Sequence, residues 1–420
     1  MILPRHRRLV LAILLACAAA AGVGWSAVAR ADSSQGLADT PWPMFQHDLQ
    51  HTGQSPLPGP LSNTVKWKHP GPGRWKGSPA IGSDGTIYVG IGWTPICAFD
   101  PSDGTQKWCT ARGGDVSHSS PAPAVAVDGT VYLGSRDNKL WSVNGTTGQA
   151  NWKYVVHVDG DVTGSPAIGP DGTIYTISAC PTATCPFINI QPGFGLALAV
   201  NPDGTTKWQL PLFGLLNSSP ALSPDAGTVY LTSRDGVLHA LKAAGDGKGN
   251  GVELWTATVG QATNVRFAFS RERVSSATIG PDGTIYVGAV GGVSAVRPSD
   301  GSVLWTFPTP NTIVLSTPAL DGAGNLFFGT TGGTFYKIRP QSPQLLWSKS
   351  GFEPFVYGAA LDSRGNVYVG ATKTVLALNG QDGSLLWSLK TRGRISSAAI
   401  GAGQILYVSS QDRYLYAIGP

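Results

Sequence analysis

One short phrase recurs along the chain and decides what the chain can fold into. The phrase DGTIYVG begins at Asp84 and again at Asp282, and each copy follows a run of small residues such as GSPAIG. A D-G dipeptide between β-branched and aromatic residues is typical of a β-hairpin turn. The copies, close or degenerate, begin at Asp84, Asp128, Asp171, Asp225, Asp282, Gly324, Gly365 and Gly403. The chain therefore reads as eight repeated units of short antiparallel strands.

A second marker, a tryptophan, closes each unit. Phrases such as AFDPSDGTQKW and ALNGQDGSLLW combine another turn with the tryptophan of a following strand. Successive tryptophans of this series lie between 40 and 56 residues apart. Four short antiparallel strands at this spacing predict one blade of a β-propeller per unit. The series consists of Trp67, Trp108, Trp152, Trp208, Trp255, Trp305, Trp347 and Trp387.

The two ends of the chain are expected to form one blade together. Residues 392–420 contain three predicted strands and no tryptophan, whereas Trp67 lies on a strand with no earlier strands of its own. Pairing the two ends would remove two exposed sheet edges. With 55 Gly and 31 Pro in 420 residues, a mainly helical protein is not expected, because these residues would interrupt helices every few positions. The sequence thus predicts an all-β fold, an eight-bladed β-propeller of four-stranded antiparallel blades over residues 64–420, preceded by an extended segment at residues 32–63.

The first 31 residues read as a secretory signal peptide. They hold four arginines and no acid, an apolar stretch from Leu9 to Ala21 and a small-x-small cleavage site before Asp32. Two alternatives stay open: a lipid on Cys17 in the lipobox-like LLAC, and an uncleaved anchor. Without this leader the formal charge falls from +5 to +1, so a nucleic-acid partner is not indicated. We expect a secreted or cell-envelope protein that meets a membrane only through the leader or the lipid.

Four further cysteines favour disulfides in an exported protein. Cys97 and Cys109 flank a D-G turn almost symmetrically and could face each other across a hairpin. Cys180 and Cys185 could close a short loop. No histidine stands at a metal-ligand spacing from either pair, which favours structural staples over a metal or redox site.

The A-x-D-x-x-x-G-x-x-x-W phrases resemble the tryptophan-docking repeat of PQQ-type propellers. The segment WPMFQHDLQHTGQSP, from Trp42, resembles the stretch that precedes the propeller in many secreted PQQ-like repeat proteins. This family includes the quinoprotein alcohol dehydrogenases and the outer-membrane assembly lipoprotein scaffold of Gram-negative bacteria. The resemblance implies that the tryptophan of each blade docks on the next blade. It implies a fold rather than a function, because function resides in sites grafted on folds.

A quinoprotein oxidoreductase is the alternative that the resemblance raises, with PQQ and calcium as its cofactors. Such enzymes often carry two adjacent cysteines and bind calcium through Glu, Asn and Asp. Here no two cysteines are adjacent, and Glu occurs only at positions 253, 272 and 353. Calcium needs several oxygen ligands that converge on one point, and the acidic candidates near strand starts are Asp115, Asp161, Glu272 and Glu353. No cofactor, catalytic residue or metal ligand is therefore predicted.

Two motifs look like metal sites but are expected to be structural. His47-Asp48-Leu49-Gln50-His51 has Asp where the H-E-x-x-H motif has its general-base Glu, which favours a surface or capping role. Residues 246–251 have the rhythm of a calcium loop, but Lys248 places a cation where a ligand oxygen belongs.

Loops that lead into the innermost strands, and hairpins between the second and third strands, share one face of such a propeller. We name it the loop-rich face. Its sequences differ from blade to blade, and loops vary where binding is selected. It is modestly cation-rich, which suits an acidic peptide, a glycan or another anionic ligand; solvated charges around a filled centre are the alternative. The candidate ligand-binding residues are Arg74, Trp75, Lys76, Trp93, His118, Asp161, Arg271, Glu272, Arg273, Glu353, Tyr357 and Arg394.

The insertion at residues 177–196 departs most from the repeat and carries apolar residues such as Phe187 and Phe194. It either packs on its own blade or contacts a partner. We expect a monomeric, exported, non-catalytic scaffold that binds a protein or cell-envelope partner through the loop-rich face. A carbohydrate-active or lyase-type propeller is a third hypothesis, and it would require convergent carboxylates.

Overall fold

The computed structural model of the protein describes residues 36–71, 73, 75, 77–91, 94–110, 121–135, 137–156, 161–162, 164–179, 194–214, 216, 218–259 and 275–420. The chain divides into two compact units, Met1–Asp32 and Ser33–Pro420, and every described residue belongs to the second. No helix among the described residues is long and apolar enough to cross a membrane. The predicted signal peptide, its cleavage site and Cys17 lie outside the described residues.

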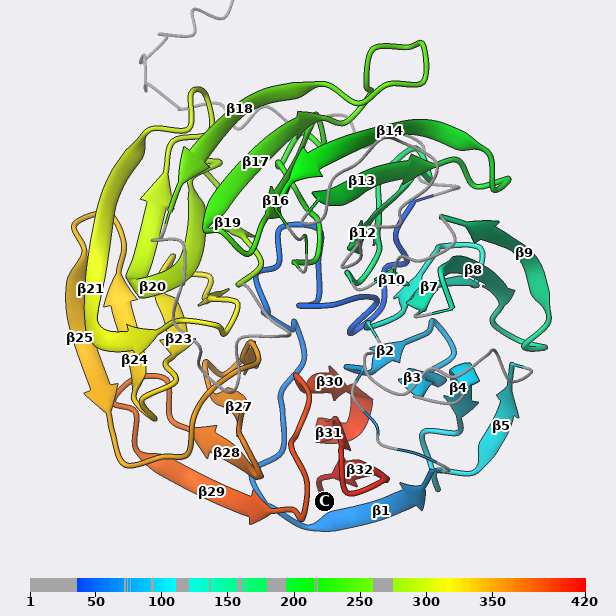
Figure 1. Ribbon diagram of the computed structural model, residues 1–420. Helices are drawn as coiled ribbons and strands as arrows, with labels where there is room; N and C mark the ends of the chain where they lie inside the picture. Colours follow the sequence, from blue (N-terminus) through cyan, green and yellow to red (C-terminus); the bar gives the residue numbers. More distant parts are fainter. Residues whose placement is uncertain are drawn as a thin grey trace, which may run out of the picture. The chain divides into compact units, whose positions relative to one another are not determined.

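Eight antiparallel sheets stand side by side in a ring (Figure 1), which confirms the predicted eight-bladed β-propeller. Each sheet, or blade, begins near the ring axis with a short buried strand and ends at the rim with a longer one. The first four blades consist of β2 (Ala80–Ile81), β3 (Ile87–Ile91), β4 (Thr94–Phe99) and β5 (Gln106–Cys109); β6 (Ala124–Val125), β7 (Thr130–Ser135), β8 (Lys139–Asn144) and β9 (Ala150–Val155); β10 (Asp161–Val162), β11 (Ala167–Ile168), β12 (Ile174–Ala179), β13 (Phe194–Val200) and β14 (Thr206–Phe213); and β15 (Ala221–Leu222), β16 (Thr228–Thr232), β17 (Val237–Lys242) and β18 (Glu253–Thr258).

The remaining four blades follow in chain order around the ring. They consist of β19 (Thr278–Ile279), β20 (Ile285–Val296) and β21 (Val303–Ile313); β22 (Ala319–Leu320), β23 (Leu326–Gly329), β24 (Phe335–Arg339) and β25 (Gln344–Lys349); β26 (Ala360–Leu361), β27 (Val367–Ala371), β28 (Thr374–Leu378) and β29 (Leu385–Lys390); and β30 (Ala399–Gly401), the 3₁₀ turn η1 (Ala402–Gln404), β31 (Ile405–Ser410), β32 (Tyr414–Ile418) and β1 (Val65–Pro70).

Two blades depart from the expected four strands. Blade 3 has a fifth short strand, β10, which pairs with the end of β12. Blade 5 has three strands, because β20 runs through Gly291, where blade 7, for example, has a turn at residues 372–373 between its second and third strands. Gly291 has φ 84, a left-handed conformation that glycine adopts without strain.

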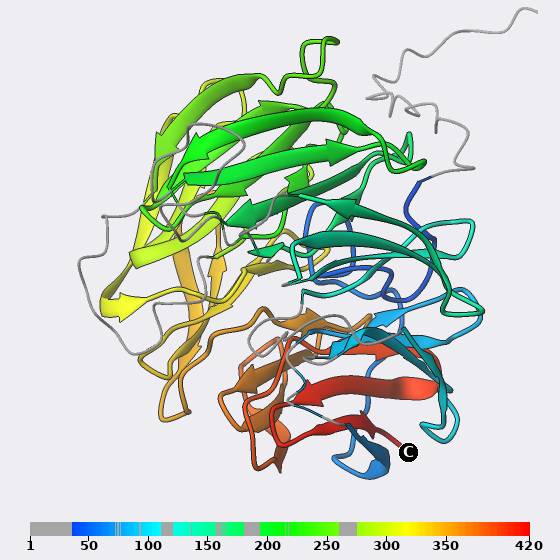
Figure 2. The same cartoon turned by 45° about the vertical axis from the view of Figure 1, so that its right-hand side comes forward.

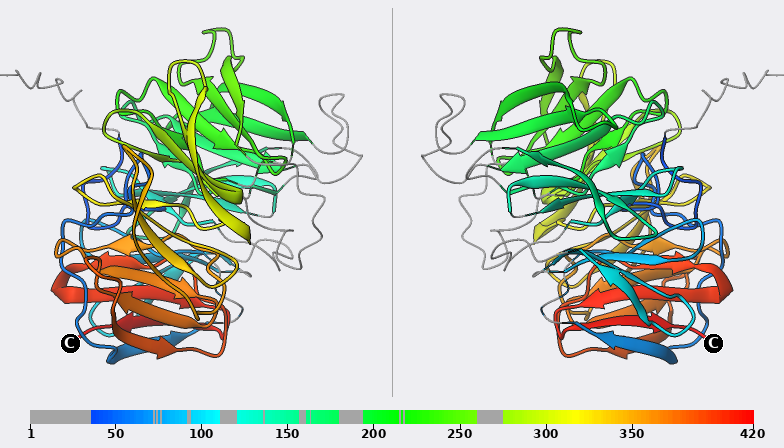
Figure 3. Two further views of the ribbon diagram at one scale, coloured as in Figure 1. Left: turned by 90° about the vertical axis from the view of Figure 1, so that its left-hand side faces the viewer. Right: turned by 90° about the vertical axis from the view of Figure 1, so that its right-hand side faces the viewer.

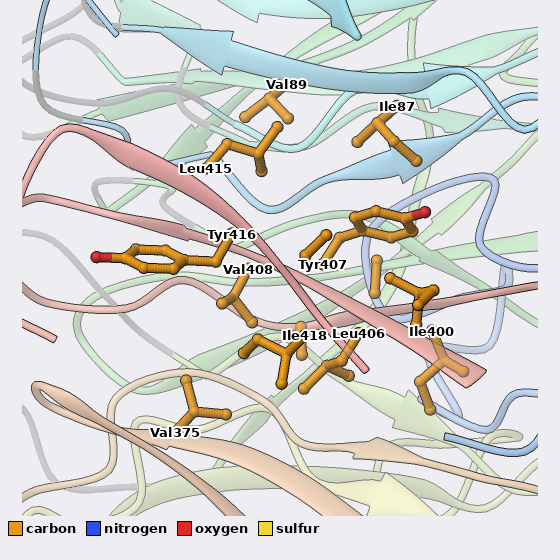
Figure 4. Packing of buried hydrophobic residues seen from close by; sticks show 14 of the residues in the cluster. Ile87, Val89, Val375, Ile400, Leu406, Tyr407, Val408, Leu415, Tyr416 and Ile418 are labelled. Atoms are coloured by element: carbon orange, nitrogen blue, oxygen red, sulfur yellow. The ribbon is translucent and has the colours of Figure 1, made fainter. Parts of the chain in front are cut away.

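The predicted closure of the ring is confirmed by blade 8. The N-terminal strand β1 lies beside the C-terminal strand β32 and pairs with it antiparallel (Figure 2). In this pairing Trp67 lies opposite Ala417 and Lys68 opposite Tyr416. A core cluster extends from this blade to both of its neighbours: Leu406, Tyr407 and Ile418 of blade 8 belong to one cluster with Ile87 of blade 1 and Val375 of blade 7 (Figure 4). The two ends of the chain therefore contribute to a single sheet.

The tryptophan series connects each blade to the next. The indole Nε1 of Trp108 donates a 3.0 Å hydrogen bond to the carbonyl oxygen of Gly145, in the outer turn of blade 2. The ring leaves no room for a side chain at Gly148 of that turn, where an ideal Cβ would lie 2.5 Å from the indole. Each ring also lies 5.8 to 6.1 Å from an aromatic ring of its own blade, as Trp108 does from Tyr88. The indoles that donate such bonds to a turn of the next blade are Trp67, Trp108, Trp152, Trp208, Trp255 and Trp347. Trp387 donates its bond to Pro60 O in the segment that precedes β1.

One of the two predicted cysteine pairs is present as a disulfide. Cys97 on β4 and Cys109 on β5 are register partners across the hairpin and are bonded to each other. The other pair, Cys180 and Cys185, lies outside the described residues.

Candidate functional site

Hydrogen bonds between main-chain groups build the described part of the loop-rich face. The loop that leads into blade 7 bonds to the β27–β28 hairpin, where Thr372 N–H donates to Pro354 O at 3.0 Å. The loop that leads into blade 8 joins the same hairpin, because Ile395 N–H donates to Thr372 O at 2.9 Å. Loops of neighbouring blades and the hairpins between second and third strands thus meet on one face.

Glu353 and Arg394 are the candidate residues best placed on this face. The Glu353 carboxylate is half-buried and accepts a 2.8 Å hydrogen bond from the backbone N–H of Lys373. Arg394 is half-buried in the next loop, and its carbonyl oxygen accepts a bond from Gln411 N–H. Lys373 and Arg392 are exposed beside them. The Asp412 carboxylate accepts a 3.1 Å bond from Arg392 N–H, so this corner between blades 7 and 8 carries two carboxylates, Glu353 and Asp412, beside several cations.

The two aromatic candidates among the described residues, Trp75 and Tyr357, belong to the interior. Trp75 is 0% exposed, and its ring lies 5.4 Å from that of Phe99. Tyr357 is 7% exposed and lies three residues before β26, the innermost strand of blade 7. Asp161 opens β10, opposite Ala179. The candidates that lie outside the described residues are Arg74, Lys76, Trp93, His118, Arg271, Glu272 and Arg273.

The opposite end of the ring axis is covered by the chain that precedes β1. This N-terminal cap, residues 36–60, lies on the side of the D-G turns (dark blue in Figure 3). Its carbonyl groups accept hydrogen bonds of 2.7 to 2.9 Å from the last residue of the innermost strand in six blades. The pairs, donor first, are Ile81 with Trp42, Val125 with Pro43, Leu222 with Leu49, Ile279 with Gln50, Leu320 with Thr52, and Leu361 with Gly53. The cap thus satisfies N–H groups that the free inner edges of the sheets would otherwise leave without a partner.

Side chains of the cap reach between the innermost strands. Gln46 is 1% exposed, and an ideal Cβ on Gly358 would lie 1.6 Å from its Nε2 atom, so the amide occupies space that only a glycine leaves open. His51 is 0% exposed, and its Nδ1 lies 3.0 Å from the carbonyl oxygen of Ala277. Since a carbonyl only accepts, Nδ1 carries the proton. Burial lowers the pKa of His51 to about 4, against the opposing effects of that hydrogen bond and of Asp48.

The H-D-L-Q-H motif is therefore part of this cap. Burial alone would raise the pKa of Asp48, but hydrogen bonds from His47 and Thr52 and the charge of His47 bring it below the usual value. Its carboxylate accepts a 2.9 Å bond from Thr52 N–H, which closes a tight turn. The sequence favours either a surface role or a capping role for this motif, and in the structure the motif caps the inner strands. Its buried position is not visible in the sequence, because backbone carbonyls make most of the contacts.

The loop at residues 246–251 is a turn closed by its own aspartate. The Asp246 carboxylate accepts bonds from the backbone N–H groups of Lys248 and Asn250 and from the Asn250 side chain. The loop then lies along the outer edge of blade 3, where Gly251 N–H donates to Gln209 O at 3.0 Å. Its carboxylate oxygens are thus used within the loop itself.

Ser233, His239 and Glu253 of blade 4 have the connectivity of a hydrolytic triad. His239 Nδ1 lies 2.7 Å from Glu253 Oε1, and His239 Nε2 lies 3.2 Å from Ser233 Oγ. However, Ser233 is 0% exposed and its hydroxyl donates to Asp235. Blade 2 has the same arrangement around Ser135, with Trp141 Nε1 in place of the histidine. The Trp141 indole, which cannot act as a base, takes the place of the histidine in blade 2. The hydrogen bonds between Ser233, His239 and Glu253 are therefore structural.

The described residues do not fit the calcium site of a quinoprotein. No three His, Cys, Asp or Glu side chains among them are close enough to hold a metal ion. Glu353 uses Oε2 on a backbone N–H, while Asp115 and Glu272 lie outside the described residues. We therefore derive no step through PQQ or calcium.

Comparison with known proteins agrees with this architecture. A family model described as outer membrane protein assembly factor BamB matches residues 59–185, 193–355 and 333–419. Among solved structures, BamB from Moraxella catarrhalis is 17% identical (TM-score 0.58; 85% of this chain and 99% of that chain covered). A quinohemoprotein alcohol dehydrogenase from Comamonas testosteroni is 13% identical (TM-score 0.72; 93% and 82% covered), and a europium-containing methanol dehydrogenase is 13% identical (TM-score 0.70; 90% and 89% covered). No curated protein gave a significant sequence match.

Ring, repeats and closure define an eight-bladed β-propeller of the PQQ-like type. The chain belongs to the PQQ-like family whose model is described as outer membrane protein assembly factor BamB, since that model matches most of its length. The structural likenesses, at 13% to 17% identity, show the fold alone.

Proposed function

We propose that this protein is an exported, non-catalytic propeller that binds a protein or cell-envelope component through its loop-rich face. The observation that carries the proposal is the N-terminal cap. It covers the D-G-turn end of the ring axis with six main-chain hydrogen bonds to inner strands, which leaves the loop-rich face as the end on which loop sequences vary. The matching family model is described as an outer membrane protein assembly factor, BamB, and this description supports a scaffold role.

The corner between blades 7 and 8 is the part of this face that we assign to the partner. Glu353 is already fixed by Lys373 N–H, whereas the Lys373 and Arg392 side chains are exposed. Cations held on hydrogen-bonded loops suit a partner with carboxylates or other anionic groups. We further propose that the tryptophan series is structural, because its indoles are committed to adjacent turns.

Site-directed photocrosslinking in the producing cell tests the binding face. A benzophenone amino acid replaces Lys373 or Arg392 on the loop-rich face, and Asp128 or Thr147 in exposed turns of the opposite face serves as the matched control. We expect a discrete crosslinked product from the first pair and none from the second. Products from the turn positions alone, or from none of the four, would contradict the proposal.

The quinoprotein alternative has its own measurement. PQQ and Ca²⁺ are titrated into the purified protein, and absorbance is recorded with and without an alcohol and an artificial electron acceptor. We expect no saturable spectral change and no dye reduction. Stoichiometric uptake followed by dye reduction would replace a binding function with an enzymatic one.

A further inference from the structure

The outermost strands share an irregularity directly before each tryptophan of the series. Two of their residues lie opposite one residue of the third strand, as Leu345 and Leu346 do opposite Ile338, so that one residue falls out of register in a β-bulge. The bulged residues, in the order of blades 8 and 1 to 7, are Lys66, Lys107, Asn151, Lys207, Leu254, Leu304, Leu346 and Leu386. The rim is therefore polar over four consecutive blades and apolar over the other four.

Three of the four bulged residues in the polar half, Lys107, Asn151 and Lys207, form side-chain hydrogen bonds within their own blades. Lys107 Nζ donates to Thr86 Oγ1 at 2.7 Å, and Lys207 Nζ lies 2.7 Å from Asp171 Oδ2. Asn151 donates to Ser142 Oγ at 3.2 Å. Lysine on an edge strand is a common protection against pairing with another chain. This half of the rim follows that rule.

The apolar half breaks the rule. Its four bulged leucines are 37% to 49% exposed, and the preceding residues Val303, Leu345 and Leu385 are 44% to 54% exposed. These side chains line the outer strands of blades 4 to 7, which lie next to one another around the ring (Figure 1). Exposed apolar side chains that recur on the outer edges of four neighbouring blades indicate an interaction surface.

Blade 3 shows how such an edge takes up an extended chain. The residue after its tryptophan, Gln209, directs both main-chain groups outward: its N–H donates to Gly249 O at 3.3 Å, and its carbonyl accepts from Gly251 N–H at 3.0 Å. The segment runs parallel to β14, and Trp208 beneath it is only 1% exposed. In blade 7 the matching carbonyl, that of Ser388, accepts a 2.9 Å bond from the Asn63 side chain.

Blade 6 has the same geometry without such a covering segment. Ser348 follows Trp347 as Gln209 follows Trp208, and within the described part of the chain no group pairs with its outward N–H or carbonyl. Exposed Leu345 and Leu346 precede it and exposed Lys349 follows it. The outer strands of blades 5, 6 and 7 contain no acidic residue, so the charges on the strands themselves are those of Lys349 and Lys390. Lys349 lies against the turn of blade 7 at Gly383, where it also interacts electrostatically with Asp382. The edge is complementary to a segment that is apolar and negatively charged.

We propose that the outer edge of blade 6 binds an extended segment of a partner protein, with apolar side chains and a carboxylate, as a parallel strand beside β25. Ser348 supplies the main-chain hydrogen bonds, Leu345 and Leu346 supply the apolar contact, and Lys349 pairs with the carboxylate. Strand addition of this kind takes its affinity from the main chain and its selectivity from alternate side chains. This site lies on the rim and is independent of the loop-rich face.

A random 12-residue peptide library displayed on phage tests the proposal, with selection on the full mature chain and a synthetic copy of the leading peptide measured by fluorescence anisotropy. Leu346→Lys copies the natural residue of blades 1 and 3, and Ser348→Pro removes the outward N–H. Asn151→Lys and Lys153→Pro make the matched changes at the edge of blade 2. Thermal unfolding verifies that all four variants are folded.

We expect enriched peptides that alternate apolar residues with an Asp or Glu. Leu346→Lys and Ser348→Pro should weaken the leading peptide at least tenfold, while the blade 2 variants bind it as the unmodified protein does. Arg392→Ala, on the loop-rich face, should leave this binding unchanged, which separates the rim site from the proposed function. Failure to enrich, or equal binding by every variant, would overturn the proposal. So would a dimer, seen by light scattering, that Leu346→Lys converts to a monomer, because a second copy would then occupy the edge.

Discussion

The indole Nε1 of Trp387 donates a 2.9 Å hydrogen bond to the carbonyl oxygen of Pro60, 327 positions earlier in the chain. The Tyr368 hydroxyl donates to the same oxygen at 3.0 Å. In blade 1, Trp108 and Tyr88 donate in the same way to Gly145 O, which belongs to an ordinary turn. The N-terminal segment therefore takes the place of the turn that blade 8 lacks, and blade 7 docks on it as on any other blade.

Replacement of Trp387 by phenylalanine should lower the free energy of unfolding by about 1 kcal/mol, the usual net value of one hydrogen bond in a protein. Trp108→Phe, which loses the bond to Gly145 O, is the matched control and should cost a similar amount. Urea unfolding measures both. A neutral Trp387→Phe beside a costly Trp108→Phe would mean that Pro60 does not replace the turn.

Gly358→Ala should destabilise the protein by about 1–3 kcal/mol, the typical cost of overfilling a well-packed interior. The added methyl group would meet the buried Gln46 amide. Gln46→Ala together with Gly358→Ala should recover part of the loss, because the space is then free. Equal stability of the single and double variants in chemical unfolding would show that the Gln46 side chain does not lie against Gly358.

Stability should fall in mild acid because of His51. Its pKa is about 4 in the folded protein and about 6.5 when unfolded, so the unfolded chain binds more protons between these values. The free energy of unfolding should therefore decrease as pH falls from about 6.5 to 4, by up to about 3 kcal/mol.

His51→Asn isolates this effect. Asparagine tolerates the positive φ of 57 at this position and can donate to Ala277 O without titrating. The difference in stability between the natural protein and the variant should shift steadily in favour of the variant below pH 6.5. A difference that does not change with pH would place His51 outside the buried cap.

Removal of the disulfide by Cys97→Ala together with Cys109→Ala should cost about 3 kcal/mol, the value that loop entropy assigns to a closed loop of this size. The two residues are 12 positions apart and already joined by the strand pairing of β4 and β5. Thermal unfolding of the double variant, compared with the natural protein under reducing and oxidising conditions, measures the contribution. If a reductant that cleaves the disulfide leaves the thermal stability of the natural protein unchanged, this predicted contribution is wrong.

Regular spacing made the propeller and its closure predictable from sequence. The tryptophans and the D-G turns repeat because every blade packs on the next blade in the same way. The strand that is missing at the C-terminal end is supplied by the N-terminal end. Cys97 and Cys109 could be paired because a hairpin turn between them places them opposite each other.

Contacts made by the backbone were not predictable in the same way. The N-terminal cap binds the inner strands through backbone carbonyl groups, which every residue has. Neither the position of the cap nor the burial of His51 can therefore be predicted from the residue types. Trp75 lies outside the tryptophan series and looked like a ligand-facing ring, yet it fills the interior beside Phe99. The division of the rim into a polar and an apolar half was also not predictable, because it requires knowing that Lys107 and Leu346 occupy equivalent bulge positions in blades 1 and 6.

Native-state hydrogen exchange tests the central claim, that β1 belongs to the same sheet as the C-terminal strands, most directly. We predict that the amides of β1 which pair with β32 exchange with the same free energy of opening as those of β31 and β32, because one sheet opens as one unit. Rapid exchange in β1 beside slow exchange in β31 and β32 would contradict a ring closed by the two ends of the chain.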